Sequence, residues 1–284
     1  MSESTTAAPA EPTITERDML GALEVLATAD PEPDRLLILT DEEIQALDGR
    51  SALTLLGSPY LDQGVVDVES SVAAALRSLA ARLLVRTEVE GREDEGEVVT
   101  GAGDPARRPA QLDRRLAGVL TLRRIPEAMV TTQRTLNGGS TTLAHYFFPE
   151  SGVLEEYVTV DGFHHFAVPA LGAVAGRIRR FVDPFEVADV DGEPVSVTLQ
   201  EATTAFDVDD TRSVSVLTAV VDGAGRQATI AATSSAVQVL DNGPIGEGRS
   251  PEDEVQLSAV SAGTLLALID VLIPRTAEAG SPQS

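Results

Sequence analysis

The chain has 284 residues and a formal net charge of −24 at pH 7, from 21 basic and 45 acidic residues. All the basic residues are arginine, and there is neither cysteine nor tryptophan. The absence of cysteine excludes disulfides, thiolate catalysis, cysteine-bound zinc and iron–sulfur clusters. The absence of lysine excludes a Walker A loop, a kinase ATP lysine, pyridoxal-phosphate Schiff bases and Ser–Lys hydrolases. A pI near 4.3 argues against a dominant nucleic-acid role, because duplex affinity depends largely on neutralising phosphates.

The length corresponds to one large or two small domains, at roughly 150 residues per domain. We divide the chain into a disordered lead-in (1–13), a first α+β half (14–185), a second α+β half (186–275) and a disordered tail (276–284). The lead-in lacks the basic and apolar regions of a secretion signal. The apolar stretch Leu265–Ile273 is far shorter than the roughly 20 residues of a membrane span. We therefore expect a cytoplasmic protein by default.

The first predicted element is a helix with Thr15 as its N-cap. Its buried face is expected to consist of three leucines at helical spacing: Leu20, Leu23 and Leu26. A short buried strand, Leu36–Leu39, follows and leads into a T-x-x-E capping box formed by Thr40 and Glu43. This box predicts a second, brief helix.

A longer helix is predicted over Glu69–Leu83, followed by a strand that alternates Val85, Thr87 and Val89 with polar residues. The helix is expected to bury Val72, Leu76, Leu79 and Leu83. The acidic stretch Glu88–Glu97 and the glycines and prolines after it predict a solvated loop. A further helix over Gln111–Leu122 is expected to turn Leu112, Leu116, Val119 and Leu120 inward.

From residue 128 the hydrophobic period changes from that of a helix to that of a strand. Four strands are predicted, at Met129–Leu136, Thr142–Phe148, Leu154–Val160 and Phe163–Val168. Asn137-Gly138 and Asp161-Gly162 between alternating strands are strong hairpin signals. A helix from Pro169 through Phe181 follows. This half is therefore an antiparallel meander with a helix after it.

The second half repeats the plan of a meander followed by a helix. The predicted elements are strands at Val214–Val221, Arg226–Thr233, Ala236–Leu240 and Val255–Val260, and a helix at Ser261–Ile273. The chain is therefore predicted to have an α+β fold of two similar halves, which we expect to pack with pseudo-symmetry, in preference to a series of βαβ units.

One motif suggests a nucleotide. Gly223-x-Gly225-x-x-Ala228 after an apolar strand matches the dinucleotide-binding pattern. Asp241 lies about where the acidic residue that binds the ribose is expected. The pattern requires a helix after the turn, but the residues that follow are β-branched and favour a strand. A hairpin turn is the preferred interpretation, and nucleotide binding at Gly223–Ala228 is kept as an alternative.

The three histidines, His145, His164 and His165, are candidates for a metal site with Glu155 or Glu156. Consecutive residues of a strand point to opposite faces, so at most one of His164 and His165 can join His145. Because a metal site needs three or four convergent ligands, packing histidines are the preferred interpretation, and no metal or cofactor is predicted.

Arginines are concentrated between Arg107 and Arg124, where six of them accompany the single acid Asp113. A surface for an acidic partner is one interpretation, which would make the chain a regulatory or scaffolding module. In a chain with 45 acids, pairing with the protein's own carboxylates is the preferred interpretation.

The order of elements and the placement of apolar residues resemble the EspG-type proteins, cytosolic chaperones of type VII secretion. The segments concerned are AALRSLAARLLV, QLDRRLAGVLTLRRIPEAMV and GVLEEYVTVDGFHHFAVPAL, within residues 15–274. The resemblance implies a protein without enzymatic activity or cofactor that binds a helical secreted protein or protein pair and covers its apolar tip. We predict no nucleic-acid binding and no membrane insertion. The predicted docking surface is the tip of the first hairpin, formed by Leu136, Asn137, Gly138, Gly139 and Ser140.

Overall fold

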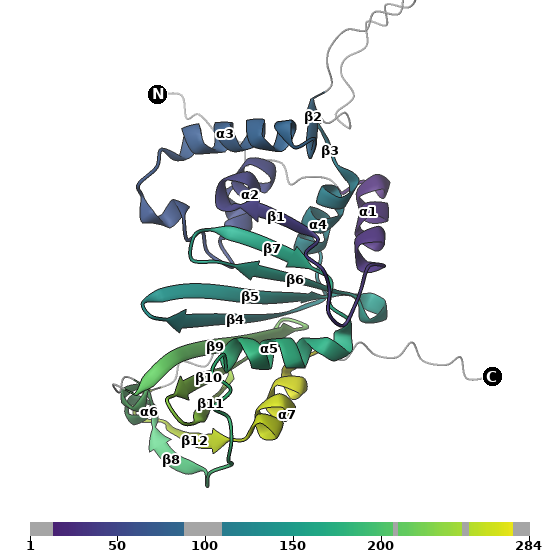
Figure 1. Cartoon of the computed structure of the whole chain (residues 1–284). Helices are drawn as coiled ribbons and strands as arrows, with labels where there is room; N and C mark the ends of the chain where they lie inside the picture. The colour runs from purple at the N-terminus through teal and green to yellow at the C-terminus, as the bar shows by residue number, and fades with distance from the viewer. Residues whose placement is uncertain (1–13, 88–109, 207–209, 246–249, 275–284) are drawn as a thin grey trace, which may run out of the picture.

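The computed structural model describes residues 14–87, 110–206, 210–245 and 250–274, and it shows an α+β fold (Figure 1). Ten strands form one sheet in which all neighbours are antiparallel. In their order across the sheet, they are β1 (Leu37–Thr40), β7 (Phe163–Ala167), β6 (Val153–Val158), β5 (Gly139–Phe147), β4 (Ala128–Leu136), β9 (Thr211–Val221), β10 (Ala224–Thr233), β11 (Val237–Pro244), β12 (Glu254–Val260) and β8 (Val195–Thr198). Two further strands, β2 (Val85–Thr87) and β3 (Ala110–Leu112), pair separately.

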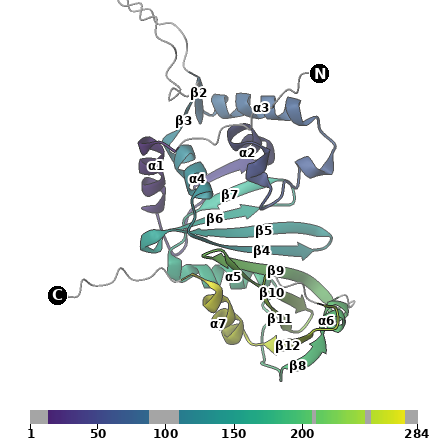
Figure 2. The same ribbon diagram turned by 180° about the vertical axis from the view of Figure 1, so that it is seen from behind.

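Helices cover both faces of the sheet (Figures 1 and 2). They are α1 (Glu16–Leu26), α2 (Asp41–Asp48), α3 (Val68–Ala81), α4 (Arg114–Arg124), α5 (Val174–Val182), α6 (Leu199–Ala205) and α7 (Ala262–Leu272). Short 3-10 turns lie at Arg50–Leu53, Leu61–Gln63, Pro149–Ser151 and Leu171–Ala173. Each face of the sheet has its own hydrophobic core. Tyr146 of β5 belongs to the core with α1 to α4, and the next residue, Phe147, belongs to the core with α5 and α7. Among the described residues, no helix is long and apolar enough to cross a bilayer.

The two predicted halves meet where β4 pairs with β9, from Ala128↔Val221 to Leu136↔Ser213. Outward from this pair the strand order is β5, β6, β7, β1 on one side and β10, β11, β12, β8 on the other. α5 follows β7 and α7 follows β12 in the chain. The core beneath α5 and α7 contains residues from strands of both halves. The sheet and this core are therefore continuous across the predicted boundary at residue 185. The pseudo-symmetry of the two halves stays a prediction.

Both predicted tight hairpins that flank the central pair are confirmed. Asn137 and Gly138 have φ of 51° and 76°, and Asp222 and Gly223 have the same two values. Two positive φ angles are typical of the type I′ turn, which matches the twist of antiparallel strands. Glycine at the second position adopts this conformation without the strain that a Cβ would cause.

The predicted buried face of the first helix is wrong at Leu20 and Leu23, while Leu26 is half-buried against the core. Thr15 does cap α1 in a capping box, but Leu20 and Leu23 are 46% and 60% exposed. The buried face instead contains Ala22 and Val25. The physical reason is a close crossing of α1 and α4, where a Cβ on Gly118 would lie 2.4 Å from the carbonyl oxygen of Gly21.

Other differences concern the edges of the fold. Leu79 is buried as predicted, but Leu76 is exposed on α3. Leu83 is also exposed, because the helix ends at Ala81 and Leu83 lies beyond it with a φ of 60°. Leu112 belongs to β3, and the following helix α4 begins at Arg114. The sequence reading missed β8 and α6 altogether. The lead-in 1–13, the tail 276–284 and the acidic stretch 88–97 lie outside the described residues.

Candidate functional site

The predicted docking residues lie at the free end of the β4–β5 hairpin. Leu136 ends β4, Asn137 and Gly138 form the exposed turn, and Gly139 and Ser140 begin β5. The two strands pair without a break from Ala128↔Phe147 to Leu136↔Gly139, which presents the turn on a continuous ladder. A hairpin paired along its full length is a rigid support for a contact surface.

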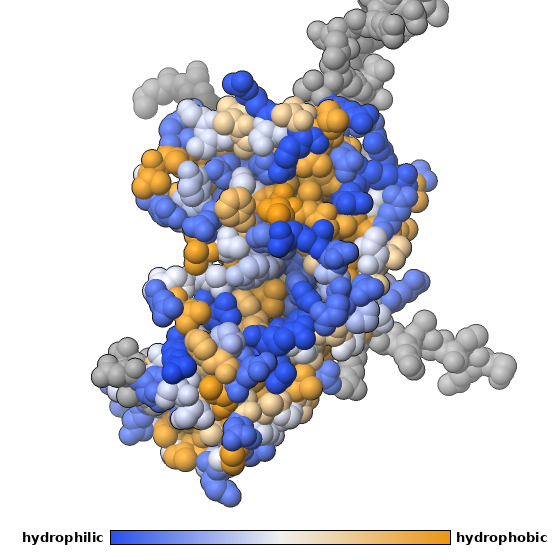
Figure 3. All heavy atoms as spheres, viewed as in Figure 1, coloured by the Kyte–Doolittle hydropathy of each residue, from blue (hydrophilic) through white to orange (hydrophobic). Residues whose placement is uncertain are grey.

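A second hairpin extends this surface. The turn between β6 and β7 brings Val160 against the first hairpin, since a Cβ on Gly139 would lie 3.0 Å from the Cγ1 atom of Val160. Val160 and Phe163 are 42% and 44% exposed, although both are large apolar residues. We call Leu136–Ser140, Val160 and Phe163 the tip surface. The outline of the molecule is indented on the left of Figure 3, on the side where the β4–β5 hairpin ends in Figure 1.

The dinucleotide pattern does not form a nucleotide site. Gly223 lies in the β9–β10 turn, and Gly225 to Ala228 continue as β10, paired with β9. No helix begins at this turn, so the helix N-terminus that would hold a pyrophosphate is missing there. Asp241 pairs with Arg226 at 3.2 Å on the neighbouring strand. The hairpin interpretation is confirmed, and the nucleotide alternative at Gly223–Ala228 loses its structural basis.

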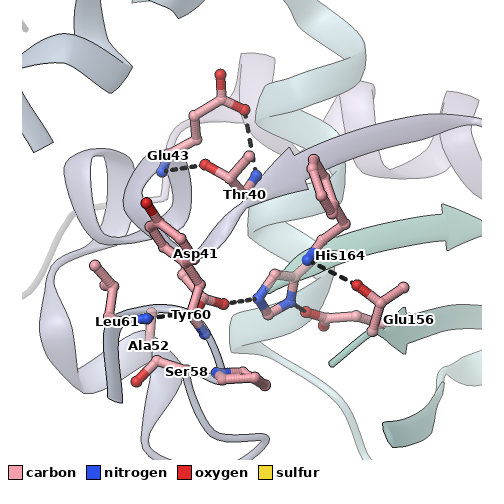
Figure 4. A network of polar contacts seen from close by, with 12 residues as sticks. Thr40, Asp41, Glu43, Ala52, Ser58, Tyr60, Leu61, Glu156 and His164 are labelled. Carbon is pink, nitrogen blue, oxygen red and sulfur yellow. Dashed lines mark hydrogen bonds and ion pairs between the residues drawn. The ribbon is translucent and has the colours of Figure 1, made fainter. Parts of the chain in front are cut away.

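The most concentrated polar chemistry lies inside the protein, on the face of the sheet beneath α2 and α4 (Figure 4). His164 of β7 places its Nδ1 atom 2.6 Å from a carboxylate oxygen of Glu156 and its Nε2 atom 2.9 Å from Asp41. Glu156 also accepts hydrogen bonds from the Tyr146 hydroxyl at 2.7 Å and from the Arg123 guanidinium at 2.8 Å. The three residues Asp41, Glu156 and His164 are completely buried. We call these five residues the buried network.

The geometry sets the protonation state of His164. Ionised carboxylates only accept hydrogen bonds, so a histidine between two of them must donate from both ring nitrogens. Burial alone would lower the pKa of His164, but its hydrogen bonds to Asp41 and Glu156 raise it above the usual 6.5. Burial would likewise raise the pKa of Glu156, but Arg123, His164 and Tyr146 hold it at about 2. Two cations and two anions therefore balance inside the core.

A second ionic cluster lies on the opposite face of the same strands. Glu155 accepts two hydrogen bonds from Arg177 of α5, at 2.5 and 2.6 Å, and faces the Nε2 atom of His145 at 2.9 Å. Burial opposes the ionisation of Glu155, but Arg177 and His145 hold its pKa at about 2. The Nδ1 atom of His145 is buried without a hydrogen-bond partner, so the ring is held through Nε2 alone.

These clusters explain the histidines without a metal. His145 and His164 lie on opposite faces of the sheet, and each is bound to a different glutamate. The metal site considered from the sequence, with both histidines as ligands, is therefore not formed. His165 points away from His164, as strand alternation requires, and is half-buried. Groups of three or more potential metal ligands are absent from the described part of the chain. The sequence reading missed both clusters. The consecutive acids of Glu155-Glu156 in an apolar strand were the signal, because one acid must face each side.

Three of the six arginines of the arginine-rich segment pair with the protein's own acids. Arg114 pairs with Glu24 at 2.7 Å, Arg123 pairs with Glu156, and Arg124 pairs with Asp48. For these three arginines the self-pairing interpretation is confirmed, while Arg107 and Arg108 lie outside the described residues. Comparison of the chain with protein-family models and with curated proteins finds no match.

Proposed function

We propose that this protein is a non-enzymatic chaperone or adaptor of the EspG type, which binds a helical type VII secretion substrate and covers its apolar tip. The observation that supports it best is the tip surface, where large apolar side chains lie exposed at the ends of two neighbouring hairpins. Exposed aromatic and aliphatic residues on a rigid support are typical anchors of protein interfaces. The resemblance of the element order to EspG-type proteins supports a helical secretion substrate as the client.

The chemistry of the interior supports a binding role over a catalytic one. His145 and His164 are fully buried and each is held against a glutamate, so neither imidazole is exposed where a substrate could react. The net charge of −24 favours solubility and limits self-association while an apolar client is held. The proposed complex uses no cofactor.

The experiment is an affinity pull-down from the native host in mild salt, with the bound proteins identified by mass spectrometry. We expect a small helical secretion substrate, or a pair of them, in near-equal amounts with the bait. Leu136→Asp and Phe163→Asp should each reduce client recovery at least about tenfold, because each places a charge where an apolar contact is buried. Val190→Asp is the matched control, since Val190 is equally apolar and 68% exposed but lies away from both hairpins.

The outcomes separate the function from the surface. An eluate without a secretion substrate would contradict the chaperone proposal itself. A client that binds the two tip variants as well as it binds wild type would leave the function standing and refute the tip surface as its docking site. Thermal unfolding of each variant shows whether the fold is retained before its binding is compared.

A further inference from the structure

A groove of about 680 Å³ lies between α5 and the face of the sheet formed by β4 to β7. It is separate from the tip surface, and the proposed chaperone role makes no use of it. Four arginines line it, together with one acid: Arg35, Arg134, Arg177, Arg180 and Glu155. Because every basic residue of the chain is arginine, the residue type itself is uninformative. Their convergence on one groove, in a chain with a net charge of −24, is the observation that needs an explanation.

The single acid of the groove is already neutralised. Glu155 is 6% exposed and is bound by Arg177 through two hydrogen bonds, with His145 on its other side. It therefore does not compensate the other three arginines. Arg180 lies 3.8 Å from Glu32, but both side chains are more than half exposed, so this pair is weak.

The two remaining arginines have donors to spare. Arg35 is exposed and forms no ion pair with any described acid. Arg134 donates from one terminal nitrogen to the Phe181 carbonyl oxygen at 2.7 Å, while its Nε atom is buried without a hydrogen-bond partner. The two terminal nitrogens of Arg134 carry four N–H groups, so donors remain for an anionic ligand in the groove beside the one hydrogen bond to Phe181.

Aromatic rings also line the groove. Tyr157 lies 6.0 Å from His165 and 6.0 Å from Phe181, measured between ring centroids. The guanidinium of Arg134 stacks over Phe181 at 4.2 Å, which fixes that arginine in place. Burial, with Arg35 nearby, lowers the pKa of His165, so its ring is uncharged at neutral pH and can pack against an aromatic group.

We propose that this groove binds a small phosphomonoester of an aromatic or heterocyclic group. The phosphate would accept hydrogen bonds from Arg35, Arg134 and Arg180, whose planar guanidinium groups match its oxygens. The ring would lie against Tyr157 and His165. The volume is that of a small-molecule pocket, in the range of roughly 300 to 1,000 Å³ that such ligands occupy.

The test uses phenyl phosphate and inorganic phosphate as probes, with the full-length chain, by isothermal titration calorimetry in low salt. We expect saturable binding of phenyl phosphate and at least about tenfold weaker binding of inorganic phosphate, because the latter lacks the ring. Arg35→Gln and Arg180→Gln should each weaken phenyl phosphate at least about tenfold, as expected for a lost charge-assisted contact. Arg77→Gln is the matched control, because Arg77 is an exposed arginine of α3, which packs on the opposite face of the sheet from α5.

Three results would overturn the proposal. The first is the absence of saturable phenyl phosphate binding up to about 10 mM. The second is an equal loss of affinity in Arg77→Gln and Arg35→Gln, which would indicate general attraction of anions to arginine. The third is tighter binding of a hexaglutamate peptide than of phenyl phosphate, which would assign the groove to an acidic chain. None of these results bears on the client pull-down, so the two proposals fail separately.

Discussion

The buried network gives the sharpest test of how this fold is held together. In Glu156→Gln the side chain keeps its size and one oxygen acceptor but loses its charge. Arg123 and His164 then remain in the core with Asp41 as the only anion of the network. Breaking a buried ion pair by removing one partner typically costs about 3–5 kcal/mol, because the other charge is left uncompensated.

The pKa of Glu156 gives an independent magnitude. It lies at about 2 in the folded protein against an ordinary 4.5, and one pKa unit corresponds to about 1.4 kcal/mol. The ionised carboxylate therefore stabilises the fold by about 3 kcal/mol at neutral pH. His164 can release its proton in the variant and so relieve part of the cost. We accordingly expect a loss near 3 rather than 5 kcal/mol.

The assay is urea unfolding followed by circular dichroism at pH 6 and at pH 3. A group with a lowered folded pKa contributes stability that is present above its unfolded value and is lost as the pH falls through the folded value. The difference between wild type and Glu156→Gln should therefore shrink by more than half at pH 3. Glu252→Gln, an exposed loop change, should shift stability by less than about 0.5 kcal/mol. A loss below about 1 kcal/mol at pH 6, or one that does not depend on pH, would refute the reasoning.

Gly118→Ala should cost about 2 to 3 kcal/mol in thermal unfolding, because its Cβ would meet the backbone of Gly21, whereas Gly172→Ala, with no atom within 4 Å, should be nearly neutral. Thr40→Ala should cost about 1 kcal/mol through loss of the α2 capping box, and Thr40→Ser should restore most of it. The raised pKa of His164 means that its contribution is complete below pH 6.5 and is lost as the pH rises through the folded value. His164→Gln should therefore flatten the fall of the melting temperature with rising pH, and an unchanged slope would contradict that assignment.

Local signals predicted most of the fold correctly. The β4–β5, β6–β7 and β9–β10 hairpins turn at Asn137-Gly138, Asp161-Gly162 and Asp222-Gly223, as their sequences predict. The capping boxes of α1 and α2 each have a threonine and an acid three residues apart. The prediction of the buried face of α1 was wrong because helical periodicity considers only the spacing of apolar residues. It contains no information on how closely two helix backbones approach. Gly21 and Gly118 interlock α1 with α4, and this contact turned Ala22 inward and left Leu20 exposed. These two glycines are 97 positions apart in the sequence, so a pattern read over neighbouring residues cannot predict their contact.

The ionic clusters show a second limit of the sequence. Strand alternation predicted that His164 and His165 face opposite sides, and the structure agrees. It could not predict that His164 meets Asp41, because the two lie 123 residues apart and are joined only when β1 pairs with β7. The same holds for the groove, where Arg35, Arg134 and Arg180 come from three separate segments.

The two edges of the sheet favour a docking surface at the strand ends. Each edge strand, β1 and β8, has only four residues and ends in a threonine that caps the next helix, Thr40 for α2 and Thr198 for α6. The strand order places these threonines at the two opposite edges of the sheet. The capping box Thr198-x-x-Glu201 was the sequence signal from which β8 and α6 could have been predicted. Short edge strands are a common protection against the addition of further strands. A client that added a strand here would gain at most four residues of pairing, so the exposed hairpin ends of the tip surface offer the larger contact.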